Sequence, residues 1–153
     1  MARITRTFTV ERSLVEVFDA LADFSQAAQW DPGVRSSAVG DAGPRVGVGA
    51  TWDLDVVLGG GVSRDFTYTT TAYDRPGHVV HETDTWYAHG VDDVTVAGSD
   101  GAVEGTWDAT FAFKGPGGLV DSFVQKGFEK VGDRAVRGLE NWLRAGGNGH
   151  SPE

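Results

Sequence analysis

A long amphipathic segment near the end of the chain constrains the fold most. Residues 117–144 have helical periodicity, and at about 100° per residue one arc is apolar: Val120, Val124, Phe128, Val131, Ala135, Leu139, Trp142 and Leu143. Gly127, Gly132 and Gly138 lie on or beside this arc, although a glycine inside a helix costs roughly 1 kcal/mol relative to alanine. They predict a close approach by a sheet or by a bound molecule, and close packing on a sheet is the simpler interpretation.

Almost everything before this helix has the pattern of strands. Residues 3–10 alternate with period two, and the capping box Ser13-Leu14-Val15-Glu16 predicts a helix. Ser25 is expected to cap a second short helical turn, which ends at Trp30-Asp31-Pro32-Gly33. Six more strands are predicted at residues 34–39, 50–58, 64–73, 78–85, 91–97 and 103–114. Because their connections are short, neighbouring strands should be antiparallel.

Length and composition exclude several classes of protein. The 153 residues favour a single domain, expected over residues 1–145, with residues 146–153 as a disordered tail. A net charge of −9 without a basic run argues against binding of nucleic acid. The absence of cysteine excludes disulfides and thiolate chemistry. No apolar run approaches the roughly 18 residues of a membrane span, so no membrane insertion and a cytoplasmic location are predicted.

Several short motifs carry a family resemblance. They are Phe8-Thr9-Val10, Val17-Phe18, Leu21-Ala22-Asp23 and Trp30-Asp31-Pro32, together with residues 82–86, 110–116 and 132–135. Across residues 3–144 they resemble the START-like, or SRPBCC (Bet v 1-like), superfamily, and the later motifs are similar to its small bacterial polyketide cyclase/dehydrase-type members. These motifs are structural, so they are specific for the fold and weak for function.

The resemblance implies an α+β helix-grip fold. In that fold a curved seven-stranded antiparallel sheet wraps around the long C-terminal helix, with two short helices between strands 1 and 2. The resemblance also implies a cavity for an apolar ligand between sheet and helix. Relatives carry Gly-Thr and an apolar residue at the start of the last strand, and here Gly105-Thr106-Trp107 is a bulky version that would shrink the cavity.

The alternation along the strands independently directs aromatic and aliphatic side chains toward the long helix. Such an interior suits a small apolar ligand, and it also suits a filled core, so both interpretations stay open. The candidate ligand-binding residues are Trp30, Trp52, Leu54, Phe66, Trp86, Trp107, Phe111, Phe123, Val124, Gly127, Phe128 and Val131. Of the glycines, Gly127 is predicted to make room for a ligand and Gly132 to serve packing.

Three polar residues, His81, Tyr68 and Arg6, are candidates for catalysis. The parity of its strand points His81 inward, near Tyr68 of the adjoining strand. A histidine and a tyrosine facing one cavity can move a proton to or from an enolisable carbonyl. Arg6 also points inward and could pair with a carboxyl or phenolate group. The alternatives are a structural, hydrogen-bonded histidine and an arginine that reaches water at a sheet edge.

Other chemistries find less support in the sequence. His78 and His81 are three residues apart, which on a strand turns their rings to opposite faces, so no metal site is predicted. Asp92 and Asp93 are interpreted as solvated turn carboxylates. The sequence contains neither a nucleophile elbow nor a phosphate loop, and no cofactor is expected.

Three functions remain open. We favour binding of a small hydrophobic ligand that is polyketide-, lipid- or aromatic-like. The second is a polyketide cyclase, aromatase or dehydratase acting in the same cavity, and the third is a co-chaperone-like interaction module with a filled core. A continuous cavity of roughly a few hundred Å³ would separate the first two from the third. Monomer and homodimer are both compatible with the sequence.

Overall fold

The computed structural model describes residues 2–59, 62–114 and 121–147, and within them the side chains of all but 58–59 and 121–126. The expected helix start at 117–120 and tail residues 148–153 therefore lie outside the described residues. Among the helices within the described ranges, none is long and apolar enough to cross a membrane.

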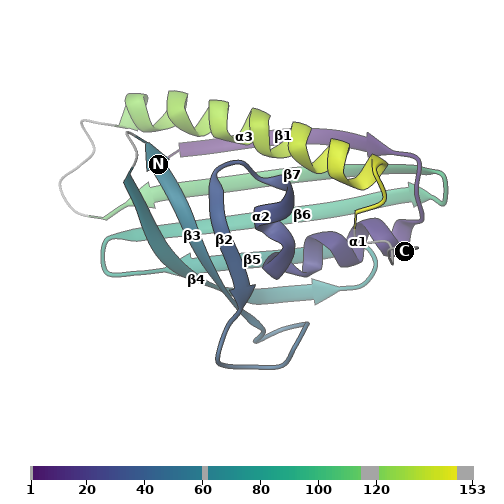
Figure 1. Cartoon of the computed structure of the whole chain (residues 1–153), viewed down its shortest axis with the longest axis horizontal. Helices are drawn as coiled ribbons and strands as arrows, with labels where there is room; N and C mark the ends of the chain where they lie inside the picture. The colour runs from purple at the N-terminus through teal and green to yellow at the C-terminus, as the bar shows by residue number, and fades with distance from the viewer. Residues whose placement is uncertain (1, 60–61, 115–120, 148–153) are drawn as a thin grey trace.

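Seven antiparallel strands form one strongly curved sheet, as predicted (Figure 1). In chain order they are β1 (Ala2–Val10), β2 (Val34–Val39), β3 (Thr51–Gly59), β4 (Val62–Asp74), β5 (His78–Asp84), β6 (Ala88–Ser99) and β7 (Ala102–Phe113). The spatial order is β1-β7-β6-β5-β4-β3-β2, so β1 and β2 are the edges. Short hairpins join the strands from β3 to β7, whereas two short helices separate β1 from β2.

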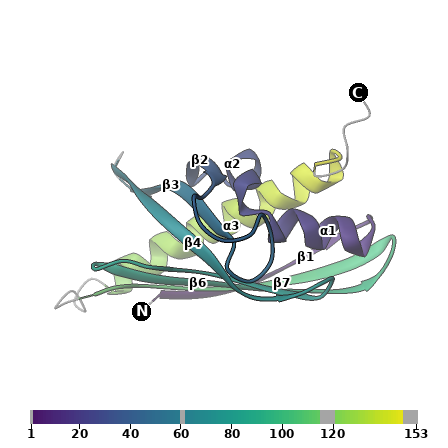
Figure 2. The same ribbon diagram turned by 90° about the horizontal axis from the view of Figure 1, so that it is seen from below.

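Four helical segments accompany the sheet: α1 (Leu14–Ala22), the 3₁₀ turn η1 (Phe24–Gln26), α2 (Ala27–Trp30) and α3 (Asp121–Arg144). Ser13 caps α1, since its Oγ accepts from the Glu16 amide at 3.3 Å. The prediction that Ser25 caps the second helical turn is wrong. Asp23 is the cap, because its carboxylate accepts from the Ser25 amide at 3.1 Å. All the helices lie on the concave side of the sheet, and α3 runs along β1 (Figure 2).

The strand β6 begins three residues earlier than the sequence predicted. The turn before it is closed by Thr85, whose Oγ1 accepts from the amides of Tyr87 and Ala88 at 3.2 and 2.9 Å. His89 and Gly90, which the predicted strand ranges leave between two strands, therefore lie inside β6, where Gly90 pairs with Thr83 and with Phe111. A side chain at Gly90 would crowd those two neighbours, which explains the glycine.

The three glycines of α3 have different surroundings. A Cβ at Gly132 would overlap the Ile4 side chain of β1, so this glycine serves packing, as predicted. A Cβ at Gly138 would overlap the backbone carbonyl of Trp30. A Cβ at Gly127 would meet no described atom within 4 Å. Two of the three therefore allow protein to approach the helix, and the third borders open space.

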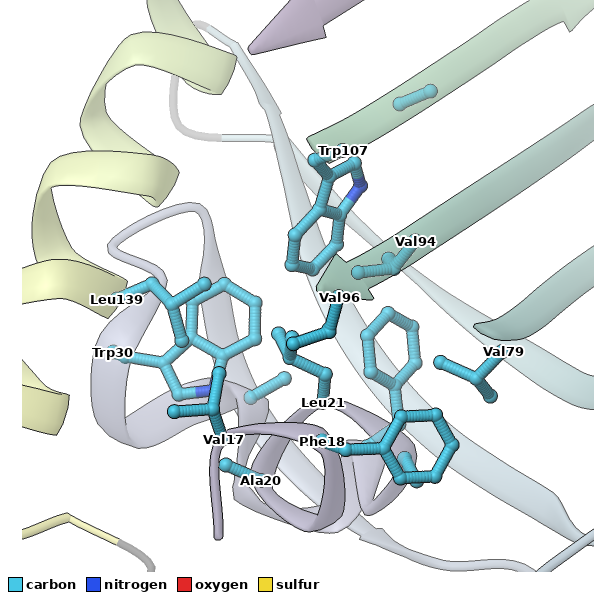
Figure 3. Packing of buried hydrophobic residues seen from close by; sticks show 14 of the residues in the cluster. Val17, Phe18, Ala20, Leu21, Trp30, Val79, Val94, Val96, Trp107 and Leu139 are labelled. Carbon is cyan, nitrogen blue, oxygen red and sulfur yellow. The ribbon is translucent and has the colours of Figure 1, made fainter. Parts of the chain in front are cut away.

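The densest packing occupies one half of the interior, where α1 and the last turns of α3 meet the sheet (Figure 3). Its members are apolar and almost fully buried: Val17, Phe18, Leu21, Val79, Val94, Val96, Leu139 and Leu143. None of these side chains reaches the space beside Gly127 and Phe128. The core thus stabilises one end of the fold and leaves the other end for a cavity.

Candidate ligand-binding site

A cavity of about 580 Å³ lies between the sheet and α3. Its walls come from β1, β2, β3, β4, β6 and β7 on the sheet side, and from η1, α2 and α3 on the helical side. Most of the lining side chains are apolar or aromatic. The volume is typical of cavities that take a small organic ligand, which are roughly 300–1,000 Å³. The bulky side chain of Trp107 lines this cavity and does not fill it.

Most of the predicted binding residues surround this cavity. Those that line it are Trp30, Leu54, Phe66, Trp107, Phe111, Gly127, Phe128 and Val131. Several of the rings pair across the elements: Trp30 of α2 meets Trp107 of β7 edge-on at 5.3 Å between centroids, and Phe111 lies 6.2 Å from Phe128. Phe123 and Val124 belong to the part of α3 whose side chains are not described.

Two of the predicted binding residues lie elsewhere, and we correct their placement. Trp52 is fully buried, and its Nε1 donates to Thr70 Oγ1 at 3.1 Å, inside the sheet rather than in the cavity. Trp86 is 88% exposed and contacts the neighbouring Tyr87 ring at 5.1 Å between centroids. It lies in the turn before β6, where the strand alternation that directs other aromatics inward has ended.

His81 points into the interior, but protein groups occupy both of its ring nitrogens. Nε2 lies 2.9 Å from the carbonyl oxygen of Leu21, and Nδ1 lies 3.0 Å from Thr70 Oγ1. A carbonyl only accepts, so Nε2 carries the proton and Nδ1 accepts from Thr70, whose hydroxyl in turn accepts from Trp52. Burial lowers the pKa of His81 to about 4. This neutral histidine, stacked on Phe24 at 4.2 Å, does not line the cavity.

The other two catalytic candidates do border the cavity. Arg6 lies on the edge strand β1, and its Nε donates to Asp133 Oδ1 of α3 at 2.6 Å. It therefore combines both sequence alternatives, a sheet-edge position and a carboxylate partner. Tyr68 is only 9% exposed, and its hydroxyl has no hydrogen-bond partner among the described residues. Burial, followed by the charges of Asp92 and Asp31, raises its pKa well above 10, so the phenol stays protonated.

Two carboxyl groups that the sequence analysis did not select share the cavity with Tyr68. Asp92 of β6 accepts from Trp107 Nε1 at 3.0 Å through Oδ1, and burial raises its pKa to about 7. Asp31, after α2, accepts from the Gly33 amide at 2.8 Å through Oδ1, and burial raises its pKa to about 6. Each charge also acts on the other group or on Tyr68, so the three belong to one electrostatic cluster.

A signal for Asp92 was present in the sequence. In β6 the inward positions are 90, 92, 94 and 96, and the parity of the buried Val94 and Val96 places Asp92 on the same face. The prediction that Asp92 is a solvated carboxylate is therefore wrong, because its side chain lies on the inward face of β6 and lines the cavity. Asp93, on the other face, forms a 2.7 Å bond with His78 near the surface.

The described residues contain no group of three or more His, Cys, Asp or Glu side chains that could hold a metal ion. Within the cavity, one phenol hydroxyl and two carboxyls with raised pKa values meet a mostly apolar wall, which also includes Arg6, Lys130 and Arg134. Such an arrangement can orient one polar end of an apolar ligand and exchange protons with it near neutral pH.

Comparison with known proteins agrees with this architecture. Residues 1–143 match the family model described as polyketide cyclase / dehydrase and lipid transport. The chain therefore belongs to this family, within the START-like superfamily that its motifs resemble. No curated protein sequence matches it significantly.

Solved structures share the fold over nearly the whole chain. A protein of Thermus thermophilus superposes with a TM-score of 0.78 at 15% identity, covering 94% of this chain and 97% of that one. A START superfamily protein of Mycobacterium smegmatis gives 0.71 at 15%, covering 94% and 99%. The Zhui aromatase/cyclase of a Streptomyces species gives 0.70 at 17%, covering 95% and 98%. At such identities the likeness shows the fold alone.

Proposed function

We propose that the cavity binds a small, mostly apolar molecule whose polar end lies at Tyr68, Asp31 and Asp92. The observation that carries the proposal is the cavity itself: about 580 Å³ of space, walled mostly by apolar and aromatic side chains, with the polar groups of Tyr68, Asp31 and Asp92 among them. An empty cavity with apolar walls lowers the stability of the fold, because the side chains around it lose van der Waals contacts. A bound ligand would restore those contacts. An interaction module with a filled core would not retain such a space.

Family membership supports an apolar ligand of lipid, polyketide or aromatic type. The description of the family includes lipid transport as well as cyclase and dehydrase chemistry. The rings of Trp30, Trp107, Phe111 and Phe128 offer edges and faces to a fused aromatic body. An aromatic or polyketide-like ligand therefore fits these walls well.

The test of binding uses the freshly purified chain. Native mass spectrometry should reveal a co-purifying compound, or the apo protein should take up 2-methylnaphthalene or a medium-chain alcohol in calorimetric titrations. The cavity protons of Phe111 and Ala109 should shift in NMR spectra, whereas those of the solvated Trp86 should not. A clean apo mass together with no uptake of either probe would contradict the proposal.

A second candidate function is acid–base catalysis of the cyclase or dehydratase kind on the bound ligand. The observation that favours it is the pair of cavity carboxyls with pKa values of about 6 and 7. In the loss of water from a β-hydroxy carbonyl compound, an ionised carboxylate removes the α-proton and a neutral acid protonates the departing hydroxyl. Near neutral pH Asp31 and Asp92 supply both forms. His81 takes no part, since both ring nitrogens are bonded to protein.

Catalysis is tested by incubating the protein with a β-hydroxyacyl thioester and following loss of water by mass spectrometry. Asp92→Asn and Asp31→Asn should each reduce the rate at least tenfold, whereas Asp65→Asn, at an exposed position of β4, should not. Binding without any turnover of such thioesters would leave the binding function and remove the catalytic one.

A further inference from the structure

The polar cluster also indicates which ligands the cavity selects, an inference that rests on the proposed binding function. We infer that the cavity prefers an apolar molecule that carries a hydrogen-bond donor, above all a protonated amine, and rejects one that carries a carboxylate. Ligands of the free fatty acid type are thereby disfavoured, although the wall is apolar enough to hold their chains.

The first support is the supply of unused acceptor atoms. In both Asp31 and Asp92 the bonded oxygen is Oδ1, which accepts from the Gly33 amide in one case and from the Trp107 indole in the other. Within the described part of the chain, Oδ2 of each carboxyl has no hydrogen-bond partner. Two acceptor atoms of cavity-lining residues are therefore available to a hydrogen-bond donor of a ligand. Carboxylates accept strong hydrogen bonds from ammonium groups.

The second support is Tyr68, whose hydroxyl has no partner among the described residues. Tyr68 lines the same cavity, and both carboxyls act on it electrostatically. Its hydroxyl is therefore open to a hydrogen bond with a ligand group. An amine or hydroxyl can donate to a carboxylate and lie beside the phenol at once, whereas a hydrocarbon can do neither.

The third support is the distribution of charge around the cavity. Its other charged groups are Arg6 of β1 and Lys130 and Arg134 of α3. Arg6 is paired with Asp133, and both α3 cations are exposed. No cation is among the groups that shift the pKa of Asp31 or Asp92. A ligand carboxylate at this cluster would meet two like charges with no nearby counter-charge.

Protonation of the cluster predicts how the preference changes with pH. Above pH 7 both carboxyls are ionised, so an ammonium group is attracted and a carboxylate is repelled. Below pH 6 both become neutral acids, which can donate to a ligand carboxylate. Amine affinity should therefore fall as the pH is lowered from 8 to 5, and carboxylate affinity should rise, with Tyr68 neutral throughout.

The test compares four ligands with one common ring: 2-methylnaphthalene, 2-naphthalenemethanol, 2-naphthylmethylamine and 2-naphthoate. Calorimetric titration at pH 8 should give the affinity order amine, alcohol, hydrocarbon, acid, with the amine at least tenfold tighter than the acid. At pH 5 this ratio should shrink at least threefold. Binding of the amine should also release protons from the carboxyls. The measured heat of binding should therefore differ between buffers of different ionisation enthalpy.

Two variants locate the preference. Asp92→Asn keeps a carbonyl oxygen for the Trp107 indole but loses the charge, and it should weaken the amine about tenfold, far more than it changes the affinity for 2-methylnaphthalene. Tyr68→Phe should weaken the alcohol more than the hydrocarbon. Asp65→Asn, at an exposed position of β4, removes one charge elsewhere and should change none of the four affinities by more than twofold.

The outcomes separate this inference from the function beneath it. If the four ligands bind equally, or the acid binds tightest and weakens in Lys130→Gln or Arg134→Gln, the cavity binds ligands but the inferred selectivity is wrong. If the amine preference persists in Asp92→Asn and in Asp31→Asn, the carboxyls are not its source and the inference fails. If none of the four ligands binds, both the inference and the proposed function fall.

Discussion

The indole nitrogen of Trp107 donates a 3.0 Å hydrogen bond to Oδ1 of Asp92 on the neighbouring strand. The bond joins a bulky ring of the cavity wall to the carboxyl with the highest pKa that the cavity contains. Without this donor the charged carboxylate would be still less favourable, since the bond opposes the effect of burial. Trp107, predicted as a bulky ligand-binding residue, therefore also holds one carboxyl of the polar cluster in place.

Removal of that donor should raise the pKa of Asp92. In Trp107→Phe the ring volume is largely kept, but the carboxylate loses its bonded N–H. The ionised form is then less stable, so the pKa should move further above 7. NMR titration of the carboxyl carbon of Asp92 measures the shift, and Trp86→Phe, at an exposed turn, is the control. An unchanged or lower pKa would contradict the role of the indole.

Asp92 should make the protein less stable as the pH rises. Its folded pKa, about 7, lies above the ordinary value, so folding favours the protonated form. The stability it contributes is present below pH 4 and is lost as the pH rises through 7. The free energy of unfolding of Asp92→Asn should therefore increase relative to that of the parent chain by about 2 kcal/mol from pH 4 to pH 8. The full pKa shift would give a larger value, but water in the cavity screens the charge. Urea denaturation of the parent chain and of Asp92→Asn at both pH values measures this difference.

His81 should have the opposite pH dependence. Its folded pKa, about 4, lies below the ordinary 6.5, so folding favours the neutral ring. The stability it contributes is complete above pH 6.5 and is lost as the pH falls through 4, by roughly 3 kcal/mol at most. In the parent chain the cavity carboxyls change the free energy of unfolding with pH in the opposite direction. The effect of His81 is therefore best measured in Asp92→Asn. NMR should find the His81 ring neutral at pH 5.5. A protonated ring at that pH would contradict the assignment of a neutral His81 bonded to Leu21 and Thr70.

The three glycines of α3 should respond differently to the same substitution. Gly138→Ala forces a methyl group against the rigid Trp30 carbonyl and should cost about 3 kcal/mol. Gly132→Ala meets the end of the Ile4 side chain, which can move, so the cost should be smaller. Gly127→Ala enters open space and should stabilise the helix by up to about 1 kcal/mol. Chemical denaturation ranks the three variants, and a large loss in Gly127→Ala would contradict the open cavity.

Gly127→Leu should block ligand uptake while leaving the fold intact. The new side chain starts from a Cβ with no described atom within 4 Å and extends along the cavity wall. Asn141→Leu, on the exposed side of the same helix, is the matched control and should bind normally. Titration with 2-methylnaphthalene and circular dichroism distinguish lost binding from lost folding. Unfolding of Gly127→Leu would show that Gly127 serves packing instead.

The strands could be predicted well from the sequence because each is half-buried and bounded by turn residues. Before β6, where Thr85 forms the turn, the predicted start of the strand was wrong by three residues. Asp92 lay inside the predicted strand, but its position on the inward face was not recognised. Alternation tells which face a side chain occupies, but not whether opposing side chains meet. The cavity therefore could not be distinguished from a filled core, and the bonds that occupy His81 came from Leu21 and Thr70, distant in sequence.

The contact of Gly138 with the Trp30 carbonyl divides α3 into two parts with separate duties. Beyond it, Leu139 and Leu143 are buried in the core, whereas before it Gly127, Phe128 and Val131 border the cavity. Residues that determine whether the chain folds thus lie at one end of the helix, and residues that determine what it holds lie at the other. Substitutions in the part of α3 before Gly138 can therefore change ligand preference, among homologues or by design, while the buried Leu139 and Leu143 stay the same.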